Sequence, residues 1–220
     1  MERILPSLIR FTGHSTKKQL GHSFLLLRDE GNVLVASQSG PRSFEEIDEV
    51  RRLGGIASQW VCHQHDVNRD GLHEELYANF GCKLHHHIRD EKGVRKRTSC
   101  PVEHFRDDGL KYAPDFEAHY FPACMDGHSI FRWKNGGKFL LFRSHSFYLR
   151  DDEWQLHIPE SPKSRRELMR PQLPKITKLR VDYVLPGYSK ADSDAEPLYK
   201  LDRASRQSLK RKFEEVMETY

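Results

Sequence analysis

The sequence predicts an α/β fold in which two sheets lie between outer helices, a four-layer αββα sandwich. The first half of the chain reads as three strands followed by alternating helices and strands, an order typical of α/β proteins. The second half is again rich in strands and ends in a helix. With 220 residues, of which 37% are hydrophobic, the chain can bury one sizeable core. We therefore expect a single domain over residues 1–220.

The first half carries short apolar runs separated by turn residues. The predicted strands lie at residues 7–13, 22–30, 33–37, 57–63 and 82–87. Two helices are predicted between the last three of these strands, at residues 43–55 and 71–81. Ser43 and Glu46 match a capping box at the start of the first helix, and Phe44, Ile47 and Val50 share one of its faces.

The second half begins with a polar, turn-rich stretch at residues 88–115, which predicts a surface excursion. Strands are predicted after it at residues 116–122, 128–134, 138–145 and 180–188. Residues 151–164 read as a loop, and a helix at 164–179 should be interrupted at Pro171 and Pro174. A final helix is predicted over residues 201–220, with Leu209, Phe213 and Val216 near one face.

Charge and cysteine usage narrow the class of protein. The 36 basic and 32 acidic residues leave a net charge of +4, and the basic runs are separated and interleaved with acids. This pattern argues against a nucleic-acid-binding surface, which usually needs a concentrated basic patch. The N-terminus lacks the features of a secretory signal, so we expect a cytoplasmic protein with four reduced cysteines. No apolar run approaches the roughly 18 residues of a membrane-spanning helix, and no membrane association is expected.

Polar loops follow four of the predicted strands. They lie at residues 63–66, 123–128, 144–146 and 186–188. Because loops at the carboxyl ends of strands in α/β sheets converge on a common crevice, their histidine and cysteine side chains could bind one tetrahedral zinc ion. Each residue also has a structural interpretation. A His-x-His pair arises easily by chance among 13 histidines, and a single cysteine is commonly a small buried apolar group.

The segment WVCHQHDVNRDGLHEELYANFG resembles the His-x-His-x-Asp-His loop of the metallo-β-lactamase fold. That αββα sandwich is shared by glyoxalase II-type thioesterases, lactonases and some nucleases. His63 and His65 match the first two histidines, whereas Val67 and Asn68 stand at the next two ligand positions. The resemblance therefore implies one metal ion at most, because the second site has lost its ligands.

Three later segments resemble the same fold in order. PACMDGHSIFRW is similar to the family's Pro-Gly-His-Thr-x-Gly-His loop, with Cys124 at the ligand histidine and His128 at a histidine that binds no metal. FLLFRSHSF places His145 at the metal-bridging aspartate. VDYVLPGYS resembles the segment that carries the last ligand histidine, with Tyr188 in its place.

The resemblance implies a site and two alternative functions. The implied metal ligands are His63, His65, Cys124 and His145, and the implied catalytic residues are Asp66, which would orient the attacking water, and His145, as fourth ligand or base. One alternative is a mononuclear zinc-dependent hydrolase of a small ester, thioester or lactone. The other is a catalytically inactive member of the fold that binds a small molecule or a protein. Three protein ligands would leave an open position for water, whereas four would close the site.

Overall fold

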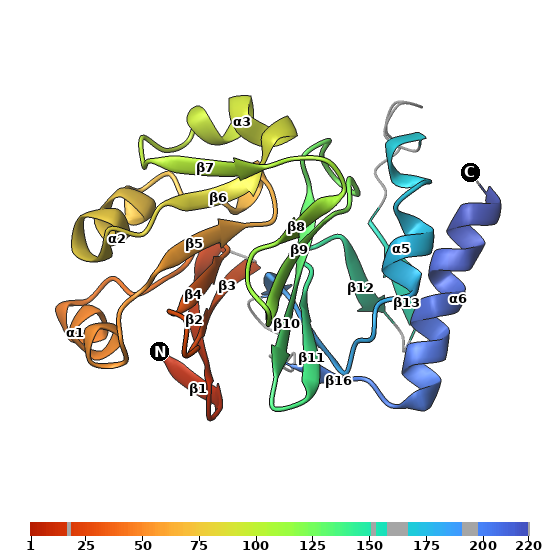
Figure 1. Cartoon of the computed structure of the whole chain (residues 1–220), viewed down its shortest axis with the longest axis horizontal. Coiled ribbons are helices and arrows are strands. Elements are labelled where there is room, and N and C mark those ends of the chain that lie inside the picture. The colour runs from red at the N-terminus through yellow and green to blue at the C-terminus, as the bar shows by residue number, and fades with distance from the viewer. Residues whose placement is uncertain (17–18, 151–152, 158–166, 191–197, 220) are drawn as a thin grey trace.

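The computed structural model describes residues 1–16, 19–150, 153–157, 167–190 and 198–219. Two sheets face each other at the centre of the molecule, and helices cover the outer face of each (Figure 1). The layers are thus helix, sheet, sheet and helix, which confirms the predicted αββα sandwich.

The first sheet has eight strands. They are β1 (Glu2–Leu5), β2 (Leu8–Thr16), β3 (Gln19–Leu26), β4 (Val33–Ala36), β5 (Ser58–Val61), β6 (Leu84–His87), β7 (Val102–Phe105) and β15 (Tyr188–Lys190). Strands β1 to β7 are neighbours in chain order, and β15 pairs with β3. Because β4 to β7 run parallel, their carboxyl ends meet at one edge of the sheet.

The second sheet has six strands in the order β16-β14-β11-β10-β9-β8. They are β8 (Gly109–Lys111), β9 (Phe116–Tyr120), β10 (Ser129–Asn135), β11 (Lys138–Phe142), β14 (Tyr183–Leu185) and β16 (Tyr199–Lys200). Strands β11 and β14 are parallel, so the loops that follow them lie on the same side. A separate hairpin consists of β12 (Phe147–Arg150) and β13 (Glu153–Leu156).

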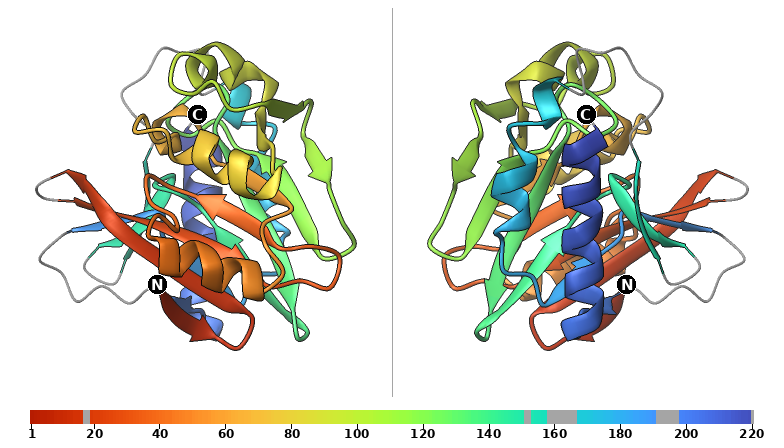
Figure 2. Two further views of the ribbon diagram at one scale, coloured as in Figure 1. Left: turned by 90° about the vertical axis from the view of Figure 1, so that its left-hand side faces the viewer. Right: turned by 90° about the vertical axis from the view of Figure 1, so that its right-hand side faces the viewer.

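Helices shield the outer faces of both sheets. Those of the first half are α1 (Phe44–Arg52), α2 (Leu72–Phe80) and α3 (Glu91–Arg95), with short 3-10 turns η1 (Gln64–Asp66) and η2 (Ile88–Asp90). Figure 2 shows α1 and α2 over the first sheet in its left view, and α5 (Leu173–Thr177) beside α6 (Arg203–Thr219) in its right view. None of the described helices is long and apolar enough to cross a membrane.

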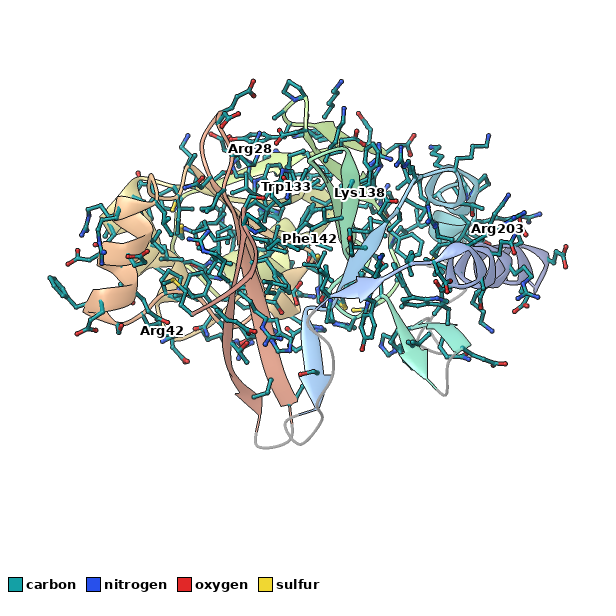
Figure 3. The ribbon with its side chains drawn as sticks, turned by 90° about the horizontal axis from the view of Figure 1, so that it is seen from below. Arg28, Arg42, Trp133, Lys138, Phe142 and Arg203 are labelled. Atoms are coloured by element: carbon teal, nitrogen blue, oxygen red, sulfur yellow. The ribbon has the colours of Figure 1, made fainter. Side chains whose placement is uncertain are left out.

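The layer between the two sheets is largely aromatic. Trp60 of β5 is fully buried there and packs edge-on against Phe116 and Phe131 of the second sheet, with ring centroids 5.2 and 5.5 Å away. Trp133 and Phe142 belong to the same buried cluster and lie near the middle of the molecule in Figure 3. Two further apolar clusters join each sheet to its own helices.

Two segments differ from the sequence-based expectation. The surface excursion predicted at residues 88–115 is wrong, because this stretch forms η2, α3, β7 and β8 and buries Val94 and Cys100. Elements of three to five residues are too short for hydrophobic periodicity to reveal them. The loop predicted at residues 151–164 contains β13, whereas residues 151–152 and 158–164 lie outside the described chain.

The ends of elements also differ in informative ways. Ser43 caps α1 as predicted and accepts a hydrogen bond from the Glu46 N–H, and Ile47 and Val50 are buried, but Phe44 is 75% exposed. The strand predicted at residues 180–188 divides at Pro186-Gly187. Its first part is β14 in the second sheet, and the chain then crosses to the first sheet as β15. This crossing brings Tyr188 to the carboxyl ends of the parallel strands.

His73 of α2 is a fully buried histidine held between strand β5 and the loop that contains Asn68. Its Nδ1–H donates to Gln59 Oε1 over 2.8 Å, and its Nε2 accepts from the Asn68 N–H over 3.2 Å. Burial lowers the pKa of His73 from 6.5 to about 4. The folded protein therefore holds this ring in its neutral form.

We expect the stability of the protein to fall as the pH drops from about 6.5 to 4, partly because of His73. The unfolded chain takes up a proton on this ring in that window and the folded chain does not, so the loss reaches roughly 3 kcal/mol at the acid end. Urea unfolding at about pH 7 and pH 5 should show a smaller pH-dependent loss in a His73→Leu variant than in the wild type. Equal losses in the two proteins would contradict this expectation.

Candidate metal centre

The structure brings the four predicted metal ligands together from three separate loops. His63 directly follows Cys62 at the end of β5 and His65 lies in η1, while Cys124 lies between β9 and β10 and His145 between β11 and β12. The nitrogen and sulfur atoms that these side chains offer lie within 4.8 Å of one another. His63 and Cys124 are buried, His145 is half-buried, and His65 is exposed. Their binding of a metal remains a prediction.

Asp66 fixes the orientation of His63. Both side chains are fully buried, and the Nδ1–H of His63 donates to Asp66 Oδ2 over 3.0 Å. A carboxylate bonded to one ring nitrogen in this way directs the other nitrogen of a metal-binding histidine toward the ion. Burial disfavours the charged ring, but the charge and hydrogen bond of Asp66, together with the neighbouring Cys124, outweigh it and raise the pKa of His63 to about 10. A metal must therefore displace a proton from this histidine.

The second carboxylate oxygen of Asp66 accepts hydrogen bonds from three hydroxyl groups of other parts of the chain. Ser144 Oγ and the Tyr188 hydroxyl each donate to Oδ1 over 2.9 Å, and Ser37 Oγ lies 3.4 Å away. Burial opposes ionisation of Asp66, but the His63 charge and hydrogen bond lower its pKa overall. These contacts make Asp66 a residue that holds the centre together. The water-orienting role expected from the sequence stays a prediction.

Val67 and Asn68 stabilise the loop that carries His63 and His65 and do not belong to the ligand group. The Val67 side chain is fully buried in the apolar cluster between the first sheet and its helices. Asn68 Nδ2 donates to the Gln38 carbonyl over 2.8 Å, and its Oδ1 accepts from the Asp70 N–H over 2.7 Å. Both positions are thus occupied by packing and backbone bonding.

Four imidazole rings crowd around the centre. The ring of His63 lies 4.9 Å from His65, 4.6 Å from His145 and 4.9 Å from His128, measured between centroids. His128 donates from Nδ1 to the Phe121 carbonyl over 3.0 Å and packs behind His63. Burial lowers the pKa of His145 to about 3, so its ring is neutral and has a lone pair to donate.

A cavity of about 560 Å³ opens in front of these residues. It is lined by Gln19, His65, His145, Tyr148, His157 and Tyr188. Tyr148 and His157 come from the β12–β13 hairpin region, and the His157 ring lies 5.3 Å from that of His145. Sequence reasoning missed both residues, because no motif surrounds them and because His157 falls in the loop predicted at residues 151–164.

The chemistry of this group suits a metal ion. Imidazole nitrogen and thiolate sulfur are good ligands of zinc and other transition metals. The His63 side chain is fully buried and interacts with Cys124 as well as with Asp66, so two of the donors already lie together inside the protein. The group could therefore hold one metal ion.

The fold, but no sequence relative, links the chain to known proteins. No family model matches the sequence, and neither does any curated protein. Among solved structures, the DIM-1 metallo-β-lactamase matches with a TM-score of 0.68 at 11% identity, covering 99% of this chain and 96% of that one. A motif mutant of a metallo-β-lactamase from Cronobacter sakazakii gives 0.61 at 17% identity, with 99% and 93% covered.

A third structure, of TTHA1623 in a di-iron-bound form, has a TM-score of 0.60 at 15% identity and covers 87% of this chain and 94% of that one. All three similarities extend over most of both chains. Together with the four layers and the strand order, they show that the chain has the metallo-β-lactamase fold.

Proposed function

We propose that this protein is a mononuclear zinc hydrolase whose ion is held by His63, His65 and Cys124, with His145 as the fourth ligand or as a base. The observation that carries the proposal is the grouping of these donors within 4.8 Å of one another beneath a cavity of about 560 Å³. A buried group of donors alone would suit a structural ion. The cavity in front of it offers room for a substrate.

The residues of the site divide into those that hold the centre and those that face a substrate. Asp66, supported by Ser144 and Tyr188, keeps His63 in one orientation. Tyr148 and His157 line the cavity and would contact the substrate. When bound, zinc would act as a Lewis acid that activates water and polarises the substrate oxygen. A small ester, thioester or lactone fits this chemistry.

The second candidate is a binding protein without hydrolytic activity. It is favoured by the side chains of Val67 and Asn68, which supply no carboxylate or imidazole next to His65. A site in which all four donors bind the ion would also leave no open position for water. In that case the cavity would serve to bind a small molecule.

We expect protein purified without chelator to contain close to one equivalent of zinc, measured by elemental analysis. Replacing Cys124 with alanine removes the only sulfur donor of the group and should weaken zinc binding by at least about tenfold in competition with a chromogenic chelator. Cys100→Ala is the matched control, because this thiol is also buried but lies outside the ligand group.

Three results would contradict the proposal. Less than about half an equivalent of any transition metal would exclude a resident ion. Full zinc binding by the Cys124→Ala variant would exclude Cys124 as a ligand. A zinc-containing protein that hydrolyses no member of a panel of small esters, thioesters and lactones would favour the binding protein over the hydrolase.

A further inference from the structure

A hollow of about 270 Å³ lies beside the metal centre and is distinct from the cavity in front of it. Its lining residues are Gln64, Arg89, Asp90, Lys92, Gly93, Lys96, Met125 and Asp126. Gln64 stands between the two predicted ligands His63 and His65, and Met125 directly follows Cys124. The hollow therefore borders two of the three loops that carry the metal-binding group.

Three cations line this hollow without acidic partners. Arg89, Lys92 and Lys96 form no ion pair and no side-chain hydrogen bond with any residue that the structure describes, although Arg89 lies over the Tyr120 ring. Two other basic residues of the same half of the chain are paired. Arg95 is bonded to Glu91 over 2.9 Å, and Lys83 to Glu103 over 2.6 Å.

The balance of charge around the hollow is positive. Two carboxylates also line it. Asp90 is 4% exposed and its Oδ2 accepts from the Gln64 N–H, so it faces the metal loop. Asp126 is exposed and adds one negative charge, which leaves Arg89, Lys92 and Lys96 in excess. An anionic group in the hollow would relieve the repulsion among these cations.

The cations are tied firmly to the metal loops. Gly93 of α3 lies against the Gln64 side chain, because a Cβ atom at this position would come within 1.8 Å of Gln64 Oε1. A Cβ atom on Gly127 would come within 2.5 Å of the Asp90 backbone nitrogen. Asp90 thus touches both loops, and the position of Lys92 and Lys96 relative to the centre is fixed by backbone contacts.

We propose that this hollow is a phosphate-binding subsite, formed by Arg89, Lys92 and Lys96, that takes a phosphate group carried by the substrate of the metal centre. Two ammonium groups and one guanidinium can together neutralise the two charges of a phosphate monoester and bond its three terminal oxygens. Only the statement that the phosphate belongs to the substrate rests on the proposed hydrolase function. Binding of the anion itself does not need the metal.

Titration calorimetry with inorganic phosphate at low ionic strength tests this proposal. We expect saturable binding, with Kd on the order of 1 mM or below, by both metal-free and zinc-containing protein. The Lys92→Ala/Lys96→Ala double variant should bind phosphate at least about tenfold more weakly and keep its zinc content. Arg95→Ala, which removes a paired cation on the same helix, should change the affinity by no more than about twofold.

Four results would overturn the subsite. They are the absence of saturable binding by the wild type, binding that requires zinc, an equal loss in Arg95→Ala, and tighter binding of a single-stranded oligonucleotide with steep salt dependence. The last result would assign the cations to nucleic acid. Failure of the hydrolase is recognised separately, because it would appear as missing zinc or missing ester hydrolysis while phosphate binding persists.

Discussion

Replacing Asp66 with alanine should lower the free energy of unfolding by about 3–5 kcal/mol and weaken metal binding about 10–100-fold. The carboxylate is fully buried and accepts hydrogen bonds from His63, Ser144 and Tyr188. Its removal leaves a buried imidazole and two buried or half-buried hydroxyls without their acceptor. Urea unfolding and chelator competition measure the two effects.

Asp70→Ala is the matched control, because Asp70 lies in the same stretch of chain but its side chain is 76% exposed. We expect this variant to lose less than about 0.5 kcal/mol and to bind metal like the wild type. Similar losses in both variants would show that Asp66 has no special role in holding His63. An Asp66→Ala protein that is destabilised but binds metal with unchanged affinity would restrict the role of Asp66 to folding.

Replacing Trp60 with alanine should cost about 3–5 kcal/mol of unfolding free energy. The ring is fully buried between the two sheets, stacks on His85 at 4.4 Å, and donates from Nε1 to Ser58 Oγ over 2.9 Å. Its loss leaves a cavity at the contact that joins both sheets. Urea unfolding followed by far-ultraviolet circular dichroism avoids the change in fluorescence that the substitution itself causes.

Phe44→Ala provides the comparison for Trp60. Phe44 is also aromatic and lies in a helix of the same half of the chain, but it is 75% exposed. Its replacement should change the unfolding free energy by less than about 0.5 kcal/mol. A loss below about 1 kcal/mol for Trp60→Ala would mean that the layer between the sheets refills the cavity.

The layer order and the four polar loops that follow predicted strands could be read from local patterns. Apolar runs on both sides of the turn at Asn135-Gly136 predict the strands β10 and β11. The capping residue Ser43 predicts the start of α1. The short elements between residues 88 and 115 could not be read in this way, because their stability comes from packing against β6 and β9. The local sequence does not show which strands these short elements will pair with.

The residues that surround the predicted ligands could not be identified from the sequence either. Asp66 could be noticed as a carboxylate near the histidines, but its hydrogen bonds to Ser144 and Tyr188 span 78 and 122 positions of the chain. Tyr148 and His157 enter the cavity from a hairpin whose sequence has no motif. Arg89, Lys92 and Lys96 belong to the stretch predicted as a surface excursion, and only the fold places them around one hollow.

The sequence by itself determined the α/β class, the sandwich order and the residue types that could bind a metal, because apolar periodicity and His-x-His spacing are local properties. Only the tertiary structure decided that His63, His65, Cys124 and His145 share one site. It also decided that Asp66 faces the imidazole of His63 and that Arg89, Lys92 and Lys96 line one hollow without an ion pair to any described residue. The physical reason is that parallel strands bring distant loops to one edge of a sheet, where distance, burial and charge are set by the whole fold.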